Sequence, residues 1–310
     1  MNLKKILTAL LALLVFSCTK PGPQPKLSLA QWSLHRMIWE KNISPYDFAE
    51  YAHNLGFKGL EYVNQLYPEV MLAEDKAAAI EDFVAKNNEL AKKYQLQNVL
   101  IMIDGEGSLS VADETERTKA VENHKIWVDA ASAMNCSAIR VNLHGSNDFE
   151  TWSAASIKSL TELANYGADK NINVLVENHG RLSSNGEALM QVINSVDLPN
   201  CGTLPDYGNF CMAEDGYGSI TDVNCSEVYD IYKGVEEMMP KAMALSAKSF
   251  DFDAEGNEIN IDYTRMLAIA NKYNYQGFIG IEYEGNDLPE IEGIVATRNL
   301  VLKNLSANEN

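Results

Sequence analysis

Eight short apolar segments, each followed by a longer helical pattern, constrain the fold of this chain more than any other feature. They lie at residues 27–32, 59–63, 98–103, 138–143, 173–176, 202–204, 242–247 and 278–281. Each is rich in β-branched or large apolar residues and is bounded by polar or glycine positions, which predicts a buried β-strand. Successive segments begin roughly 30–40 residues apart, the length of a strand–helix crossover unit.

Amphipathic helical patterns fill the intervals between these segments. Ser44 and Pro45 form a cap and first turn, and Gly56 ends the same helix. Further helices are predicted at 74–94, 114–134, 153–170, 186–196, 226–239, 263–273 and 288–304. Eight such units predict an α/β chain folded as a (β/α)8 TIM barrel over residues 27–305, with a short tail at 306–310. A doubly wound open sheet is the alternative, but no glycine-rich phosphate loop follows the first apolar segment.

The first 26 residues have the pattern of a bacterial lipoprotein signal. Lys4 and Lys5 precede an apolar run at 6–16, which is too short to span a bilayer and fits the core of a signal peptide. We therefore expect residues 1–17 to be cleaved, Cys18 to carry lipid, and residues 18–26 to form a proline-rich tether. A plain secretory signal is the alternative. Both kinds of signal predict that the protein is exported. The lipoprotein signal also predicts that lipid anchors the protein to the bacterial cell envelope, on the periplasmic side.

The net charge of the chain restricts the classes of molecule that it can bind. The sequence has 25 Lys and Arg against 43 Asp and Glu, a formal net charge of −18. Because nucleic acids are bound through basic surfaces, a partner of that class is excluded. Small neutral carbohydrates and cations are compatible with this charge.

Four cysteines follow the signal segment, at positions 136, 201, 211 and 225. Export would place them in an oxidising compartment. Because a large core needs no cross-links, four unpaired thiols are the favoured interpretation. Pairing of Cys211 with Cys225, which flank a long loop, is the alternative.

Polar side chains gather where the predicted strands end. In a (β/α)8 barrel the active site is built at the carboxyl ends of the strands. The residues there are Trp32, His35, Arg36, Glu61, Asp104, Arg140, Asn142, His144, Glu177, His179, Asp206, Asn209, Ser246, Lys248, Glu282 and Glu284. We expect the carboxylates and imidazoles among them to converge on one cavity. Each residue taken singly is equally compatible with a structural role at the barrel rim.

Four segments, in this order and at these strand ends, resemble the sugar phosphate isomerase/epimerase family of xylose isomerase-like barrels. They are Glu177-Asn178-His179-Gly180, Pro205-Asp206-Tyr207-Gly208-Asn209, Ser246-Ala247-Lys248-Ser249 and Glu282-Tyr283-Glu284-Gly285. The resemblance implies metal ligation by Glu177, Asp206 and Glu282, with Ser246 standing where the family has its histidine ligand. It also implies that Glu177 and Glu282 move protons next to a sugar carbonyl. Asn209 stands where related epimerases often have a substrate-binding histidine.

The exchange of histidine for Ser246 leaves two interpretations of the cofactor. In the first, the three carboxylates hold a hard divalent ion, Mn²⁺ or Mg²⁺. In the second, no metal binds and Lys248, which shares a strand face with Ser246, supplies the positive charge and acts as a catalytic residue.

The predicted activity is that of a carbohydrate isomerase or epimerase using enediolate chemistry. Substrate contacts are expected from Trp32, His35, Glu61, Arg140, Asn142, His144, His179 and Asn209, and stacking on a sugar from Trp32 or Trp39. A keto-sugar or keto-glycoside lyase or hydratase is the first alternative, and a sugar-binding lipoprotein without catalysis is the second.

Overall fold

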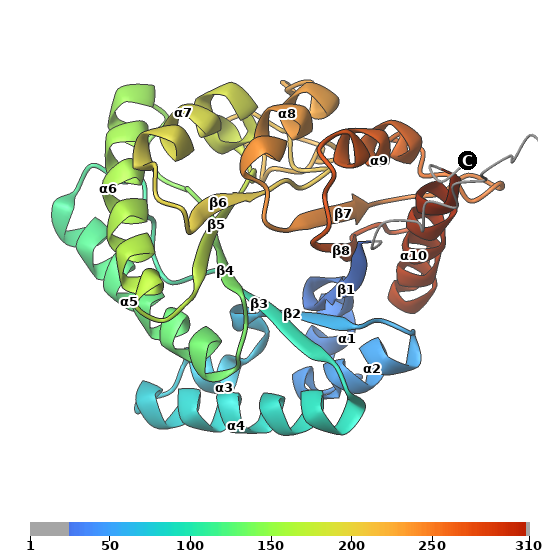
Figure 1. Cartoon of the computed structure of the whole chain (residues 1–310), viewed down its shortest axis with the longest axis horizontal. Coiled ribbons are helices and arrows are strands. Elements are labelled where there is room, and N and C mark those ends of the chain that lie inside the picture. The colour runs from blue at the N-terminus through green and yellow to red at the C-terminus, as the bar shows by residue number, and fades with distance from the viewer. Residues whose placement is uncertain (1–24, 308–310) are drawn as a thin grey trace, which may run out of the picture.

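The computed structural model describes residues 25–307, in which eight parallel strands form one sheet surrounded by helices (Figure 1). The strands are β1 Lys26–Ala30, β2 Gly59–Val63, β3 Gln97–Ile103, β4 Ala138–Val141, β5 Asn173–Glu177, β6 Cys201–Leu204, β7 Leu245–Ser249 and β8 Phe278–Tyr283. Residues 1–17 and Cys18 lie outside the described part of the chain. No helix between residues 25 and 307 is both long and apolar enough to cross a membrane.

Strand order follows chain order, and the sheet closes into a barrel. β1 pairs with both β2 and β8, and the sheet runs from β6 through β1 to β7. Its two ends meet through parallel bridges between Thr203 and Ala242 and between Asp206 and Ser246. The fold is therefore the predicted TIM barrel, and the alternative of an open sheet is wrong.

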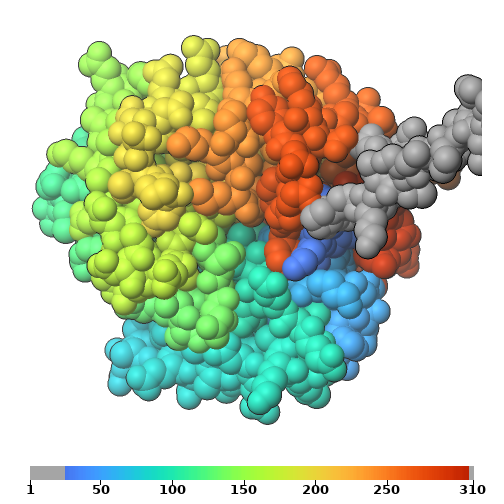
Figure 2. Space-filling view, viewed as in Figure 1, coloured from blue at the N-terminus to red at the C-terminus, as the bar shows by residue number. Residues whose placement is uncertain are grey.

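The principal helices lie on the outer side of the strands. They are α2 Phe48–Asn54, α4 Lys76–Tyr94, α5 Glu114–Ala133, α6 Phe149–Ala168, α7 Gly186–Val196, α8 Ile231–Met238, α9 Tyr263–Lys272 and α10 Glu290–Ala307. The units follow one another around the molecule, from blue through green to red (Figure 2). Side-chain caps fix where several of these helices begin, because an acid or amide oxygen accepts an otherwise unpaired backbone N–H. Asp75, Asp113, Asp148, Asn185, Asp230 and Asp262 do this.

Several predicted boundaries move, among them the starts of β7, α8 and α6, the last of which begins at Phe149 instead of 153. β7 begins at Leu245 instead of residue 242, because a short helical turn at Met239–Lys241 precedes it and Ala242 makes only an isolated bridge. α8 begins at Ile231 instead of 226, since Asp230 caps it. Short helices that the sequence pattern did not indicate also follow strand ends, among them α1 His35–Trp39 and α3 Pro68–Met71.

The core between sheet and helices is anchored by large aromatic side chains. Trp152 on α6 is 1% exposed, and its indole Nε1 donates to the carbonyl of Leu143, 2.9 Å away. That hydrogen bond joins the helix to the segment that follows β4. Burial of Trp152 therefore fixes part of the rim on which the strand ends lie.

Replacing this side chain should destabilise the barrel. We expect Trp152→Ala to lower the free energy of unfolding by about 3–5 kcal/mol, because it leaves a cavity and an unpaired carbonyl. Urea unfolding followed by circular dichroism measures the change. Phe149→Ala is the matched control, since Phe149 lies on the same helix and is 37% exposed; it should cost less than about 1 kcal/mol. Equal losses in the two variants would contradict this assignment.

Candidate active site

A cavity of about 290 Å³ lies at the carboxyl ends of the strands. Side chains from several strand ends and two loops line it: Trp32, His35, Arg36, Gln65, Asp104, Arg140, Glu177, His179, Asn209, Tyr217, Ser219, Lys248, Glu282, Glu284 and Asn286. Most of these are charged or hydrogen-bonding groups. The cavity therefore suits a small polar ligand.

Glu177, at the end of β5, is held on both carboxylate oxygens. Asn209 Nδ2 donates to Oε1 over 3.0 Å, and Arg140 Nε lies 2.8 Å from Oε2 in an ion pair. Arg140 Nη1 also donates to Asp104 Oδ1 over 2.9 Å, as does Asn142 Nδ2 over 2.8 Å. This chain of contacts fixes the orientation of Glu177 across three strands.

Lys248, on β7, is the second cation of the site and is only 1% exposed. Its Nζ lies 3.8 Å from Asp206 Oδ2, 3.6 Å from Glu282 Oε1 and 3.3 Å from Glu284 Oε1. Ser246 shares the strand and donates to Glu282 Oε2 over 2.9 Å. Glu282 is therefore held between a hydroxyl and an ammonium group.

The side chains of Glu177, Asp206 and Glu282 form a triad that fits a metal ion. One oxygen from each lies within 4.8 Å of the other two, and all three residues are buried. Asp206 Oδ1 accepts from the backbone N–H of Gly208, whereas buried Oδ2 has no hydrogen-bond partner in the described residues. A buried carboxylate oxygen without a partner is costly, and a cation would satisfy it. Ser246 contributes no imidazole, so the donor set consists of carboxylate oxygens, which suit hard ions.

Acidic side chains outnumber basic side chains in this part of the barrel. Besides the triad, Asp104, Glu284 and the deeper Glu61 contribute carboxylates, while Arg140 and Lys248 contribute the buried cations. Burial raises the pKa of Glu177 to about 8, with Arg140 opposing this shift. Burial likewise raises the pKa of Asp206 to about 7 and of Glu61 to about 8. Although burial alone would lower the pKa of Lys248, the surrounding acids raise it well above its usual value, so its ammonium stays charged.

Two histidines and a tyrosine form the rim beside β4 and β5. The ring of His179 lies perpendicular to those of His144 and Tyr217, with centroids 5.6 and 5.4 Å away. Burial, then Lys248, lowers the pKa of His179 well below its usual value, so its imidazole is neutral at pH 7. His179 Nδ1 is buried without a hydrogen-bond partner in the described residues. A neutral imidazole with a free nitrogen is suited to bind a hydroxyl group.

Most of the predicted site residues lie in the cavity wall. Trp32, His35, Arg140, Glu177, His179, Asn209, Lys248 and Glu282 line it. Asp206 lies beside them against Lys248, and His144 packs at the rim against His179. Asn142 holds Asp104 without lining the cavity. Glu61 is fully buried in the barrel, where Ser28 Oγ donates to it over 2.5 Å, so it lies apart from the cavity wall.

The sequence interpretation did not single out Gln65, Tyr217, Ser219 or Asn286, all of which line the cavity. They come from loops, where no periodic pattern marks them. For Tyr217, the one signal in the sequence was the pair of flanking glycines, Gly216 and Gly218, which mark a loop. Asn178 is also more important than expected: its side chain donates to the carbonyls of Asp206 and Asn209 and accepts from Asp206 N–H. It thereby sets the end of β6 beside that of β5.

The favoured prediction of four unpaired thiols is wrong. Cys211 and Cys225 form a disulfide, with Cα atoms 5.7 Å apart, whereas Cys136 and Cys201 are free and buried. The bridge closes the loop after β6 around Tyr217 and Ser219. Spacing alone did not reveal it, because two cysteines 14 residues apart meet only if the loop folds back on itself.

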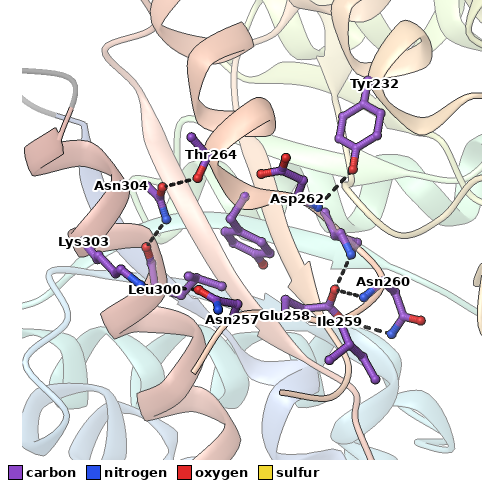
Figure 3. A pocket seen from close by; sticks show the side chains of 12 residues that line it. Tyr232, Asn257, Glu258, Ile259, Asn260, Asp262, Thr264, Leu300, Lys303 and Asn304 are labelled. Atoms are coloured by element: carbon purple, nitrogen blue, oxygen red, sulfur yellow. Dashed lines mark hydrogen bonds between the residues drawn. The ribbon is translucent and has the colours of Figure 1, made fainter. Parts of the chain in front are cut away.

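A different pocket, of about 370 Å³, lies outside the barrel mouth, between the loop before α9 and helix α10 (Figure 3). Its one buried acid, Glu258, accepts hydrogen bonds from the backbone N–H groups of Asn260 and Ile261 and from the Asn260 side chain. These bonds hold the loop in its shape. Among the residues that line this pocket, Glu258 is the one buried acid, so the pocket holds no cluster of buried carboxylates like that of the strand-end cavity.

The sequence and the fold were compared with protein families and with solved structures. A family model described as xylose isomerase-like TIM barrel matches residues 49–304. No curated protein matches the sequence. Among solved structures, a D-tagatose 3-epimerase-like protein has a TM-score of 0.67 at 17% identity, over 92% of this chain and 98% of its own.

Two further structures are similar in the same way. The IOLI protein, in a structure with a bound zinc atom, has a TM-score of 0.67 at 14% identity, over 91% of this chain and 98% of its own. A 3-keto-D-glucoside 4-epimerase from E. coli has a TM-score of 0.66 at 12% identity, over 90% of this chain and 100% of its own. At these identities the likeness shows the fold.

The disulfide should stabilise the loop that carries Tyr217. We expect Cys211→Ser/Cys225→Ser to lose about 3 kcal/mol in the free energy of unfolding, because closing a loop of this length restricts the unfolded chain. Urea unfolding with and without reductant measures it. Reductant should weaken the native protein by the same amount and leave the double variant unchanged. Alkylation of both thiols in unreduced, denatured protein would contradict the pairing.

Proposed function

Since the chain belongs to the xylose isomerase-like TIM barrel family, we propose that it is a carbohydrate isomerase or epimerase that removes a proton next to a sugar carbonyl. The observation that carries the proposal is the position of Glu177 and Glu282. They are fixed by separate partners, line one cavity, and each offers a carboxylate oxygen within 4.8 Å of the other. Reversing a stereocentre needs proton transfer on two faces of one carbon, which two separately held carboxylates provide.

Glu177 is suited to exchange protons near neutral pH. Burial raises its pKa to about 8, and a divalent ion bound to the same carboxylate would lower that pKa, so that Glu177 is ionised and able to accept a proton at physiological pH. Arg140 and Asn209 fix both of its oxygens, which limits the directions in which it accepts a proton. Glu282, held by Ser246, would donate or accept on the opposite side.

Removing that proton places negative charge on the former carbonyl oxygen. Lys248 Nζ, buried and permanently charged, is positioned to stabilise this oxyanion from one side. We propose that Glu177, Asp206 and Glu282 hold Mn²⁺ or Mg²⁺, in line with their carboxylate donors. When bound, such an ion supplies Lewis-acid polarisation of the carbonyl.

The other cavity residues would bind and orient the sugar. His179, Arg140 and Asn209 present donors and acceptors to hydroxyl groups, while Trp32 and His35 form a flat wall. His144 and Asn142 act through His179 and Asp104, which they contact. Because Glu61 lies beneath the cavity and burial raises its pKa to about 8, we propose that it is mostly protonated at neutral pH and acts by hydrogen bonding to Ser28 in the barrel interior, not by touching the sugar.

We also propose that the protein works outside the cytoplasm, anchored to the cell envelope through lipid on Cys18. The Cys211–Cys225 disulfide supports this location, since such bonds persist in oxidising compartments. Mass spectrometry of Cys18 in a membrane fraction would test the anchor.

Removing either proton-transfer group should stop the reaction. We expect Glu177→Gln and Glu282→Gln to lower turnover by a hundredfold to ten-thousandfold, roughly the contribution of a general acid or base. The measurement is NMR detection of deuterium uptake by a 3-keto-glucoside in deuterated solvent. Glu150→Gln, an exposed change on α6, is the control and should leave the rate unchanged. Full activity in either cavity variant would defeat the assignment. Cleavage of the glycoside would instead indicate a lyase, and binding without exchange a sugar-binding protein.

Metal removal distinguishes the two sources of positive charge. We expect purified protein to contain about one equivalent of divalent ion per chain, to lose activity in chelator and to regain it with Mn²⁺ or Mg²⁺. Elemental analysis combined with activity assays measures this. Asp206→Asn should lower the bound metal without unfolding the chain. Metal-free protein with full activity would show that Lys248 stabilises the oxyanion without a metal ion.

A further inference from the structure

The active-site cavity continues outward along helix α1. Arg36 and Asn286 line the cavity and also line a neighbouring open hollow of about 650 Å³. Arg36 is held in place between the two, since its Nη1 donates to the carbonyl of Gly285 over 2.8 Å and to Asn286 Oδ1 over 3.3 Å. A ligand that fills the inner cavity therefore has room to extend past these two side chains.

An ordered aromatic cluster at α1 also leads outward from the cavity, and its outermost member, Trp39, lies outside the lining of both the cavity and the hollow. Trp32 and His35, both in the cavity wall, stack with centroids 4.6 Å apart at an interplanar angle of 11°. His35 Nδ1 donates to the carbonyl of Trp32 over 2.6 Å, which fixes the pair. Trp39 meets Trp32 edge-on at 5.2 Å and His35 at 5.0 Å, and it is 55% exposed. The aromatic surface thus extends from inside the cavity to the solvent.

The charges around this exit select a neutral occupant. Glu40 and Asp287 line the outer hollow, and Glu284 lines the cavity. Glu290 also lines the hollow, but its carboxylate accepts from the backbone N–H groups of Arg36 and Met37. Arg36 is the one cation among the residues that line the hollow. Its charge is already engaged, since Nε lies 3.6 Å from Glu290 Oε1. An anionic group such as a phosphate would be repelled here. A sugar ring has apolar C–H faces for an indole and hydroxyl groups for Arg36 and Asn286.

From this combination we infer that α1 forms a second sugar subsite, and that the substrate is a neutral glycoside with a second ring instead of a monosaccharide or a sugar phosphate. The reacting ring occupies the inner cavity, and the second ring packs on Trp39 beside Arg36. This inference rests on the proposed function for the identity of the reacting ring. The subsite itself depends only on the contacts of α1.

Binding of unreactive sugars tests the subsite without catalysis. The probes are glucose, glucose 6-phosphate and the disaccharides cellobiose, maltose and trehalose, titrated by calorimetry and by saturation-transfer NMR. We expect at least one disaccharide to bind about tenfold more tightly than glucose, and glucose 6-phosphate to bind no better than glucose. Trp39→Ala should abolish the disaccharide advantage and leave glucose binding unchanged. Trp39→Phe should retain most of it, because a flat ring remains.

Tyr273→Ala serves as the control, since Tyr273 is a partly exposed aromatic residue, at 37%, that caps the carboxyl end of α9 and lines neither the cavity nor the hollow. It should leave all affinities unchanged. Disaccharides that bind no better than glucose, an advantage that survives Trp39→Ala, or tighter binding of glucose 6-phosphate would each overturn the inference. If disaccharides bind in a Trp39-dependent way but no keto-glycoside exchanges hydrogen, the subsite stands and the proposed reaction fails.

Discussion

The imbalance of buried charge at the barrel mouth is the constraint on which the site depends. Glu177, Asp206 and Glu282 meet within 4.8 Å, and Arg140 and Lys248 supply the buried positive charge beside them. Ionised acids at this density are unstable together in a buried site unless protons or cations compensate them. Burial raises the pKa values of Glu177 and Asp206 accordingly, which keeps protons at the position where a proton-transfer reaction needs them. A divalent ion would replace those protons.

Barrel closure brings these groups together. The β6–β7 junction is joined by bridges instead of a full ladder, and one bridge joins Asp206 to Ser246. Asn178 fixes the backbone of Asp206 from β5, while Ser246 fixes Glu282 on β8. Two side-chain hydrogen bonds and one backbone bridge thus link four consecutive strands at the point where the chemistry is proposed. Ser246 offers no imidazole to a metal ion and instead donates a hydrogen bond to Glu282.

The sequence predicted the barrel and most of the cavity because both follow from short-range patterns. Apolar segments mark buried strands, and a barrel places their carboxyl ends together, so Glu177, Asp206, Lys248 and Glu282 were expected to meet. The cavity residues that come from loops could not be predicted in this way. Tyr217 reaches the cavity because a disulfide folds its loop back, and Glu61 lies below the cavity because its carboxylate points into the barrel toward Ser28. Both outcomes depend on three-dimensional packing that no residue spacing encodes.

The central claim is that a divalent ion bound by Glu177, Asp206 and Glu282 compensates the buried acids. The most direct test is a crystal of active protein grown with Mn²⁺, in which the anomalous scattering of the ion is measured. The account predicts one anomalous peak within coordination distance of Glu177, Asp206 and Glu282, with the Lys248 ammonium still beside Glu282 and Glu284. A fully active crystal without that peak, in which Lys248 Nζ has moved into direct contact with the triad oxygens, would contradict it.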